Sequence, residues 1–228
     1  MAAADILETS DGPVAIRPIY HASLVLAFRH QAIYLDPTGG AGRYRDLPRP
    51  DLVLLTHEHP DHLDIPTLEG VVSAETRILG AAVAVRELQG PLARKASTIA
   101  QGDHVTFNDV GITALPAHNL SPDRLKFHPR GVGNGYLLGF GDKTVYVSGD
   151  TEDIPEMRAL AGVDVAFLPM NLPYTMTGPQ AAGAVRAFRP KVVYPFHYLG
   201  GNENEVFAEA LRGEAGIEVR LRDWYAEA

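Results

Sequence analysis

A short segment of the chain, residues 56–62, gathers side chains that can bind metal ions. It reads Thr56-His57-Glu58-His59-Pro60-Asp61-His62, so three of the nine histidines lie within six residues. Neutral imidazole is the commonest protein ligand for zinc-like ions. The His-x-His pair can face one ion, while the carboxylate two residues on and the adjacent histidine turn toward a second. The alternative is a loop whose histidines only form hydrogen bonds with neighbours, but so dense a cluster favours a metal site.

Three further residues of the same chemical kind follow later predicted strands. They are His118 in Pro116-Ala117-His118-Asn119, Asp150 in Ser148-Gly149-Asp150-Thr151, and His197 in Pro195-Phe196-His197-Tyr198. Together with His57-x-His59-x-Asp61-His62 they resemble the signature of the metallo-β-lactamase superfamily, over almost the whole chain. This resemblance implies an α+β fold, the four-layer αβ/βα sandwich, formed as a single domain over residues 1–228. It also implies the ligand sets: His57, His59 and His118 for one metal, Asp61, His62 and His197 for the other, and Asp150 as the bridge.

Such a site is suited to hydrolysis. Two divalent ions about 3.5–4 Å apart share one water, lower its pKa and stabilise a leaving oxygen. The expected nucleophile is the hydroxide between the ions, and Asp61 and Asp150 are the expected catalytic carboxylates, with Asp61 placed to accept a proton. Zinc is the first choice of metal, with manganese or iron as alternatives. Diiron oxygen-reducing relatives resemble this signature but carry Glu where this chain has His59, which favours hydrolysis over redox chemistry.

Four residues outside the ligand set are expected substrate contacts. Tyr20-His21-Ala22-Ser23 is similar to a turn in the branch of the superfamily that contains ascorbate-6-phosphate lactonase and N-acyl-phosphatidylethanolamine phospholipase D. His21 therefore either faces the metal site or is a hydrogen-bonded turn residue. The same resemblance makes His128 a pocket residue. Asn171 and Tyr174 follow a predicted strand and either bind substrate or pack as ordinary structural residues.

The elements that must position these side chains are short strands separated by turns. Residues 51–56 form a compact apolar run with a polar stop, which predicts a buried strand that leads into the histidine cluster. Further strands are predicted over 14–19, 23–28, 32–35, 76–79, 111–115, 134–140, 143–147, 163–168, 191–194 and 217–220. Helices are predicted over 81–88, 152–160 and 203–212, and from a capping box at Thr177 and Gln180 to Phe188. Both halves of the chain mix strands and helices.

Composition excludes several classes of protein. The chain has no cysteine, so disulfides, thiolate metal sites and cysteine nucleophiles are impossible. The formal net charge of −8 argues against nucleic acid as the main partner. No secretory signal or membrane-spanning stretch is visible, so a cytoplasmic enzyme acting on a small molecule is expected, with a homo-oligomer left open. The predicted reaction is cleavage of a lactone, carboxylic ester, amide or phosphodiester. The alternatives are a nuclease or phosphodiesterase, and a non-catalytic metal-dependent ligand-binding module.

Overall fold

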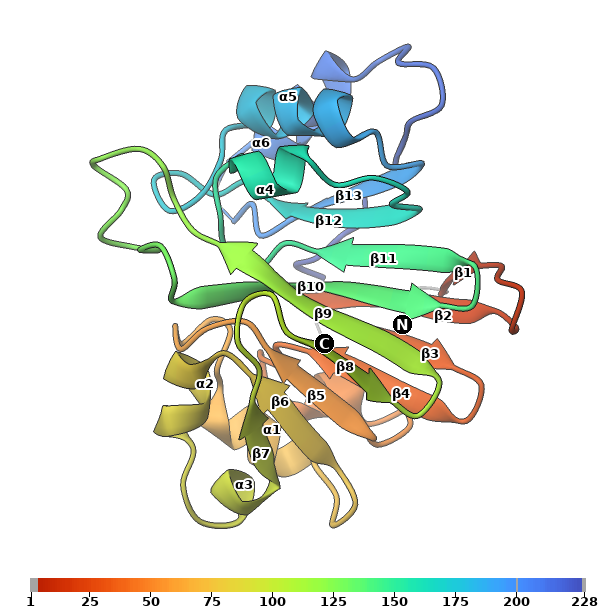
Figure 1. Ribbon diagram of the computed structural model, residues 1–228, viewed down its shortest axis with the longest axis vertical. Helices are drawn as coiled ribbons and strands as arrows, with labels where there is room; N and C mark the ends of the chain where they lie inside the picture. The colour runs from red at the N-terminus through yellow and green to blue at the C-terminus, as the bar shows by residue number, and fades with distance from the viewer. Residues whose placement is uncertain (1–3, 200, 227–228) are drawn as a thin grey trace. The chain divides into compact units, whose positions relative to one another are not determined.

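The computed structural model describes residues 4–199 and 201–226, and the chain divides into two compact units. Unit 1 contains the chain up to Ala100 together with the segment from Asp223, and unit 2 contains Gln101–Arg222. Figure 1 shows the part of unit 1 up to Ala100 in red to yellow and unit 2 in green to blue, and the segment from Asp223 lies at the blue end of the colour bar. Whether the two units act as one domain stays a prediction.

Unit 1 is built on a seven-stranded sheet in which the strands follow one another in chain order. The first four strands are antiparallel, and β4 to β7 are parallel. Its strands are β1 (Asp5–Leu7), β2 (Val14–Tyr20), β3 (Ser23–Phe28), β4 (Gln31–Leu35), β5 (Leu52–Leu55), β6 (Arg77–Gly80) and β7 (Ala96–Thr98). The connections form η1 (Ala41–Tyr44), α1 (Ile65–Val71), α2 (Ala82–Glu87) and α3 (Gly90–Lys95). Every residue of β4 and β5 is buried, as expected for strands covered on both faces.

Unit 2 repeats this pattern. Its sheet runs in chain order through β8 (His104–Phe107), β9 (Val110–Ala117), β10 (Gly133–Phe140), β11 (Lys143–Val147), β12 (Val165–Pro169), β13 (Val192–Phe196) and β14 (Glu218–Val219). Strands β8 to β11 are antiparallel, and β11 to β14 are parallel. The helices α4 (Pro155–Arg158), α5 (Gly178–Phe188) and α6 (Glu203–Ala210) gather beside β12 and β13 in Figure 1.

This topology brings the ends of particular strands to one edge of each sheet. In unit 1, β2, β4 and β5 point the same way, so the residues that follow them lie at one edge. In unit 2 the same holds for β9, β11, β12 and β13. The carboxyl edge of such strands is where α/β sheets place their ligands. The predicted site residues follow these strands in both units.

Most of the predicted elements are confirmed, and the differences have local causes. The capping box is present: Thr177 Oγ1 accepts from the Gln180 amide, and Gln180 Oε1 accepts from the Thr177 amide. The helix predicted over 152–160 is shorter and begins only at Pro155, because Glu152 is held by the neighbouring loop. Helix α1 was not predicted, although Asp64 caps it by accepting from the Thr67 amide. None of the helices in the described part of the chain is long and apolar enough to cross a bilayer.

Candidate metal centre

In unit 1 the loop after β5 turns three imidazoles toward a common region. His57 Nε2 lies 3.1 Å from His59 Nδ1, and the His57 and His62 ring centroids are 4.1 Å apart. His57 and His62 are buried, and His59 is partly buried. Behind them Asp36, the first residue after β4, accepts hydrogen bonds from the Thr56 amide and hydroxyl at 2.8 and 2.5 Å. A buried carboxylate therefore supports this loop from inside the unit.

For His57 and His62, the hydrogen-bond partners fix which ring nitrogen carries the hydrogen. The His62 Nδ1 atom lies 2.8 Å from Asp36 Oδ2, which can only accept as an ionised carboxylate, so Nδ1 donates. The Thr56 hydroxyl already donates to Asp36, so it accepts from His57 Nδ1 at 2.9 Å. With hydrogen on Nδ1, the Nε2 atom of each neutral ring presents a lone pair. Orientation of an imidazole by an oxygen acceptor behind it is the usual arrangement of metal-binding histidines.

His21, in the turn after β2, supports the remaining carboxylate of this loop. Its Nε2 atom lies 3.0 Å from Asp61 Oδ2, and its Nδ1 atom lies 2.9 Å from Tyr225 Oη. Three possible ligand atoms, one each from His21, Asp61 and His62, lie within 4.8 Å of one another. The His21 amide also donates to the Trp224 carbonyl at 3.1 Å. The structure thus places His21 against a predicted ligand, and the segment after Asp223 holds it there.

In unit 2, His118 follows β9 and has the same tautomer. Its Nδ1 atom lies 2.9 Å from the Asn119 carbonyl oxygen, which can only accept. The Nε2 atom is buried and has no hydrogen-bond partner among residues 4–199 and 201–226. A buried lone pair with no donor is costly unless a cation binds it. The donor set of His118 therefore fits a divalent ion.

Asp150, after β11, lies between two further imidazoles of unit 2. Its Oδ2 atom is 3.2 Å from His197 Nε2 and 3.3 Å from His128 Nε2. His128 Nδ1 lies 3.0 Å from the Tyr174 carbonyl oxygen and donates to it. All three side chains are almost fully buried. The structure therefore brings His128, predicted as a substrate contact, beside two predicted ligands.

Several of these residues occupy the left-handed region of the backbone map. The φ angles are 55° at His21, 41° at Asp36 and 50° at His197. Non-glycine residues in this region cost of order 1–3 kcal/mol each and cluster at functional sites. The strain at these three positions accords with a site whose geometry is imposed by the surrounding fold.

Asn171 and Tyr174 lie on the loop after β12. The Asn171 carbonyl accepts from the amides of Tyr174 and Thr175, so its backbone forms a turn. The Tyr174 ring is 42% exposed and packs edge-on against Phe127 at 4.9 Å between centroids. The exposed ring of Tyr174 is available to a ligand, whereas its carbonyl is occupied by structural contacts.

Sequence reasoning missed the residues that support the His118 and Asp150 loops of unit 2. Glu152 accepts from the amides of Leu120 and Ser121 at 2.6 Å each and from Arg124 at 2.8 Å. Burial opposes ionisation of Glu152, but these hydrogen bonds and the Arg124 charge hold its pKa below the ordinary value. Asn119 donates to the carbonyls of Arg124 and Tyr174. The signal available in sequence was position alone, since Glu152 follows Asp150 and Asn119 follows His118.

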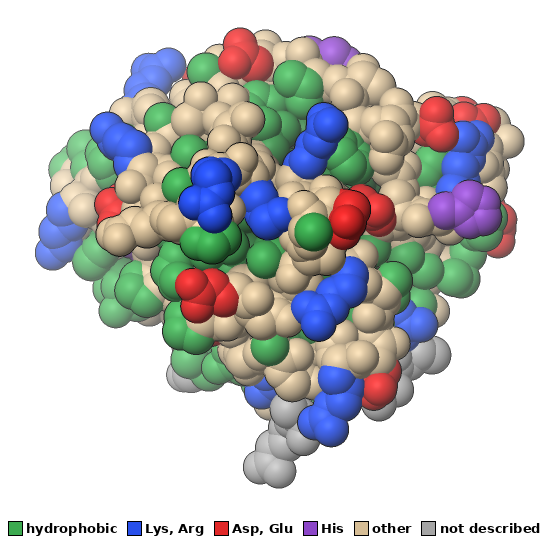
Figure 2. All heavy atoms as spheres, turned by 90° about the horizontal axis from the view of Figure 1, so that it is seen from below, with side chains coloured by type: hydrophobic (Ala, Val, Ile, Leu, Met, Phe, Trp, Pro, Cys, Tyr) green, Lys and Arg blue, Asp and Glu red, His purple; other side chains and the backbone are tan. Residues whose placement is uncertain are grey.

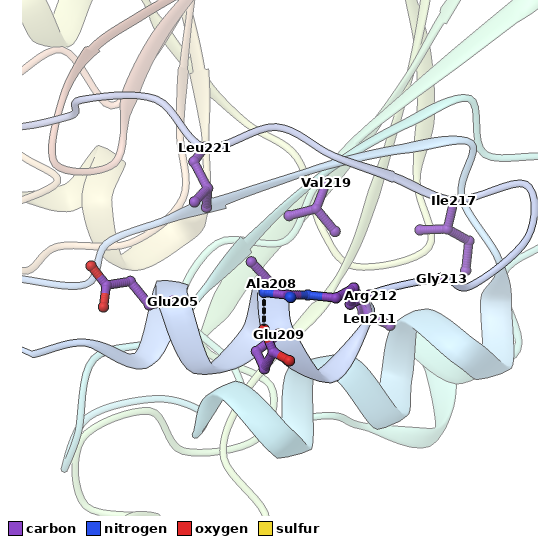
Figure 3. Close-up of a pocket in the computed structure, with 9 residues that line it drawn as sticks. All are labelled: Glu205, Ala208, Glu209, Leu211, Arg212, Gly213, Ile217, Val219 and Leu221. Atoms are coloured by element: carbon purple, nitrogen blue, oxygen red, sulfur yellow. Dashed lines mark ion pairs between the residues drawn. The ribbon is translucent and has the colours of Figure 1, made fainter.

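Other surface features lie apart from these residues. Figure 3 shows a pocket of unit 2 between α6 and the β14 region, with the exposed ion pair between Arg212 and Glu209 drawn as a dashed line. None of the predicted site residues lines it. On the face drawn in Figure 2, basic side chains are dispersed among apolar and acidic ones and form no continuous stripe. This face offers no extended basic track for a nucleic-acid backbone.

Comparison with known proteins gives the family. A family model described as the β-lactamase superfamily domain matches residues 24–198. The UPF0173 metal-dependent hydrolase of Pyrococcus horikoshii is 33% identical over 199 residues, which cover 81% of this chain and 84% of that protein. A crystal structure from Parabacteroides distasonis, named as a candidate metal-dependent hydrolase, has a TM-score of 0.88 at 41% identity and covers 96% of this chain and 97% of that chain.

A more distant neighbour shares the fold alone. The diiron β-hydroxylase of Streptomyces venezuelae has a TM-score of 0.70 at 19% identity and covers 97% of this chain and 53% of that chain. The matches confirm the predicted metallo-β-lactamase fold, with two mixed seven-stranded sheets and their helices. The chain therefore belongs to the metallo-β-lactamase superfamily and, within it, to the UPF0173 metal-dependent hydrolase family.

Proposed function

We propose that this protein is a hydrolase that binds two divalent metal ions and cleaves an ester-like bond of a small molecule. The observation that carries the proposal is the orientation of three histidines. His57, His62 and His118 each donate from Nδ1 to an oxygen, which leaves Nε2 of each neutral ring as the acceptor atom; that of His57 faces His59 Nδ1 at 3.1 Å. An ordinary hydrogen-bonding role would not require the same tautomer at all three. The names of the relatives, which are metal-dependent hydrolases, support the same activity.

The proposed ligand sets are those implied by the family pattern. His57, His59 and His118 would hold one ion, Asp61, His62 and His197 would hold the other, and Asp150 would be shared between them. Nitrogen and carboxylate donors of this kind suit zinc first, and manganese or iron as alternatives. When bound, two such ions supply Lewis-acid activation of water and of the scissile group. His59 favours hydrolysis, because the sequence pattern of diiron oxygen-reducing relatives has Glu there.

The residues behind the ligands have positioning roles in this proposal. Asp36 orients His62 directly and His57 through the Thr56 hydroxyl. His21 donates to Asp61 and so limits the rotation of that exposed carboxylate. Asp61 and Asp150 balance the charge of the ions, and Asp61 is the proposed proton acceptor.

Exposed apolar side chains indicate what kind of small molecule fits. Seven large apolar residues are exposed in the described part of the chain, and four of them lie on two loops of unit 2. Leu120 and Leu125 follow His118, and Leu172 and Tyr174 follow β12, with exposed fractions of 40–46%. The loops meet where Asn119 and His128 donate to the Tyr174 carbonyl. Because clustered exposed apolar groups mark ligand sites, we propose a substrate with an apolar portion beside its ester-like bond.

The test is metal analysis followed by a substrate panel. Protein purified without chelators should contain two equivalents of divalent metal by inductively coupled plasma mass spectrometry. The metal-loaded protein should hydrolyse members of a panel of lactones, carboxylic esters and amides, with kcat/KM rising as the acyl chain lengthens. His57→Ala and His118→Ala should lose both metal and activity. A metal-free protein, or full activity in either variant, would refute the proposal.

Two other functions make different predictions in the same assays. A phosphodiesterase or nuclease would cleave bis-p-nitrophenyl phosphate in preference to carboxylic esters. A non-catalytic binding module would take up metal but remain inert across the entire panel. The net charge of −8 disfavours the nuclease.

A further inference from the structure

Glu152 is a buried carboxylate that the proposed chemistry does not use. Its side chain is almost completely buried, yet four donors converge on it. Oε2 accepts from the amides of Leu120 and Ser121, and Oε1 accepts from the Ser121 hydroxyl at 2.7 Å and from Arg124 at 2.8 Å. The Arg186–Glu214 pair of the same unit is, by contrast, far more exposed, at 45% and 29%. A buried ion pair whose carboxylate accepts four hydrogen bonds is a strongly directional contact.

The segment around Glu152 contains one predicted ligand, Asp150, and forms hydrogen bonds with the segment of another, His118. Glu152 lies two residues after Asp150, and the amides it accepts from lie two and three residues after His118. The His118 carbonyl accepts from the Glu152 amide at 3.0 Å and from the Thr151 hydroxyl at 2.8 Å. The His118 amide donates to the same hydroxyl at 3.2 Å. Hydrogen bonds therefore connect residues 150–152 to the amide and carbonyl of His118 and to the residues that follow it.

Arg124 extends the connection to a third segment. Its Nη1 atom donates to Glu152 and also, at 3.0 Å, to the carbonyl of Thr175. Thr175 adjoins Tyr174, whose carbonyl accepts from Asn119 and His128. One ion pair thus links the loops that carry His118, Asp150 and Tyr174.

We propose that the Glu152–Arg124 pair is a positioning device for the metal site, fixing the loops of His118 and Asp150 so that their ligand atoms are held in place for the ion. This inference rests on the proposed function. Partners behind metal ligands commonly change metal affinity by about 10–100-fold when they are removed. Neither side chain binds the ion itself, so the pair acts through His118 and Asp150.

The experiment compares zinc affinity with stability in matched variants. Glu152→Gln, Arg124→Met and the double variant are measured against Arg186→Met and Glu214→Gln, which disrupt an exposed pair in the same unit. Zinc affinity comes from competition with a chromophoric chelator, and stability comes from urea unfolding of the metal-free proteins. Circular dichroism confirms that each variant is folded at the temperature of the binding assay.

We call Glu152→Gln, Arg124→Met and their double variant the clamp variants. Each single clamp variant should bind zinc about 10–100-fold more weakly, while the Arg186 and Glu214 variants keep the parent affinity. The double variant should recover stability, because no buried charge is left without its partner, but should not recover affinity. Parent affinity in all clamp variants would overturn the inference, as would affinity that recovers together with stability. If the parent protein binds no zinc, manganese or iron, the proposed function fails as well. If it binds metal and the clamp variants bind equally, only this inference fails.

Discussion

Replacement of Asp36 by Asn tests the metal centre from behind the ligands. The change is nearly isosteric, and Asn tolerates the left-handed φ of 41° that this position adopts. Asp36 uses Oδ1 for the Thr56 amide and Oδ2 for both the Thr56 hydroxyl and His62. Asn has one acceptor oxygen, so either the backbone amide loses its acceptor or the new amide group faces His62 Nδ1. In the second arrangement hydrogen moves to His62 Nε2 and removes the lone pair.

The expected magnitude follows from the contact that is lost. A hydrogen bond to a charged group contributes about 1.5–3 kcal/mol. At about 1.4 kcal/mol for each tenfold change, zinc affinity should fall by roughly 10–100-fold. The assay is chelator competition on folded protein, with metal content determined in parallel. Activity of the variant at saturating zinc reports whether the ligand geometry is recovered once the ion is bound.

Asp51→Asn is the matched control. Asp51 lies in the same unit and accepts from the Ala32 amide at 2.8 Å, so its replacement affects a backbone contact and not an imidazole. It should lower stability modestly and leave zinc affinity unchanged. Equal affinity in Asp36→Asn and the parent would refute the tautomer argument for His62. Equal losses in both variants would mean that general destabilisation is the cause.

Three further perturbations give distinct outcomes. Asp150→Asn should reduce metal content at both positions, since it removes the charge of the carboxylate proposed to be shared by both ions; two full equivalents by mass spectrometry would show that it is not shared. Gly135→Ala should lower the free energy of unfolding by about 1–3 kcal/mol, because a Cβ there would lie 2.6 Å from the Ser148 carbonyl; an unchanged urea midpoint would contradict this. Burial raises the pKa of Tyr34 to about 12, so the stability that its neutral phenol contributes is complete below pH 10 and is lost as pH rises through about 12. Tyr34→Phe should therefore lose less stability than the parent between pH 10 and 12, and identical urea-unfolding profiles would refute that reasoning.

Some elements of this protein could be predicted from the sequence, because their local sequence patterns agree with the burial of their residues in the structure. Strand β5 is an apolar run with a polar stop, and the structure buries all four of its residues. The Thr177 capping box predicted α5, and both of its hydrogen bonds are present. The strand ends then placed His57, His118, Asp150 and His197 after buried strands, as the structure confirms. Their roles as ligands remain predictions.

What sequence could not provide were contacts between residues distant in the chain. Nothing local distinguishes Glu152 from the acid of an ordinary helix start, and its segment was predicted as the beginning of a helix. Its loop structure depends on Arg124 and on amides about 30 residues earlier. His21 was ambiguous for the same reason, because its partners Asp61 and Tyr225 are 40 and 204 residues away. Helix α1 was missed because it has only seven residues and its start is marked only by the capping Asp64 and a proline in the first turn.

The discontinuity of unit 1 affects how the protein matures. Unit 2 is one continuous stretch, so its sheet has all seven strands before Trp224 is synthesised. The turn at His21 must wait for the Trp224 carbonyl and the Tyr225 hydroxyl, by which time every residue of unit 2 has been added. On the ribosome the loop of unit 2 that contains Asp150 can therefore be ready first, and the loop of unit 1 that contains Asp61 is completed last. A premature stop just before Trp224 would leave a chain with every strand of its second sheet but without the Trp224 and Tyr225 contacts of His21.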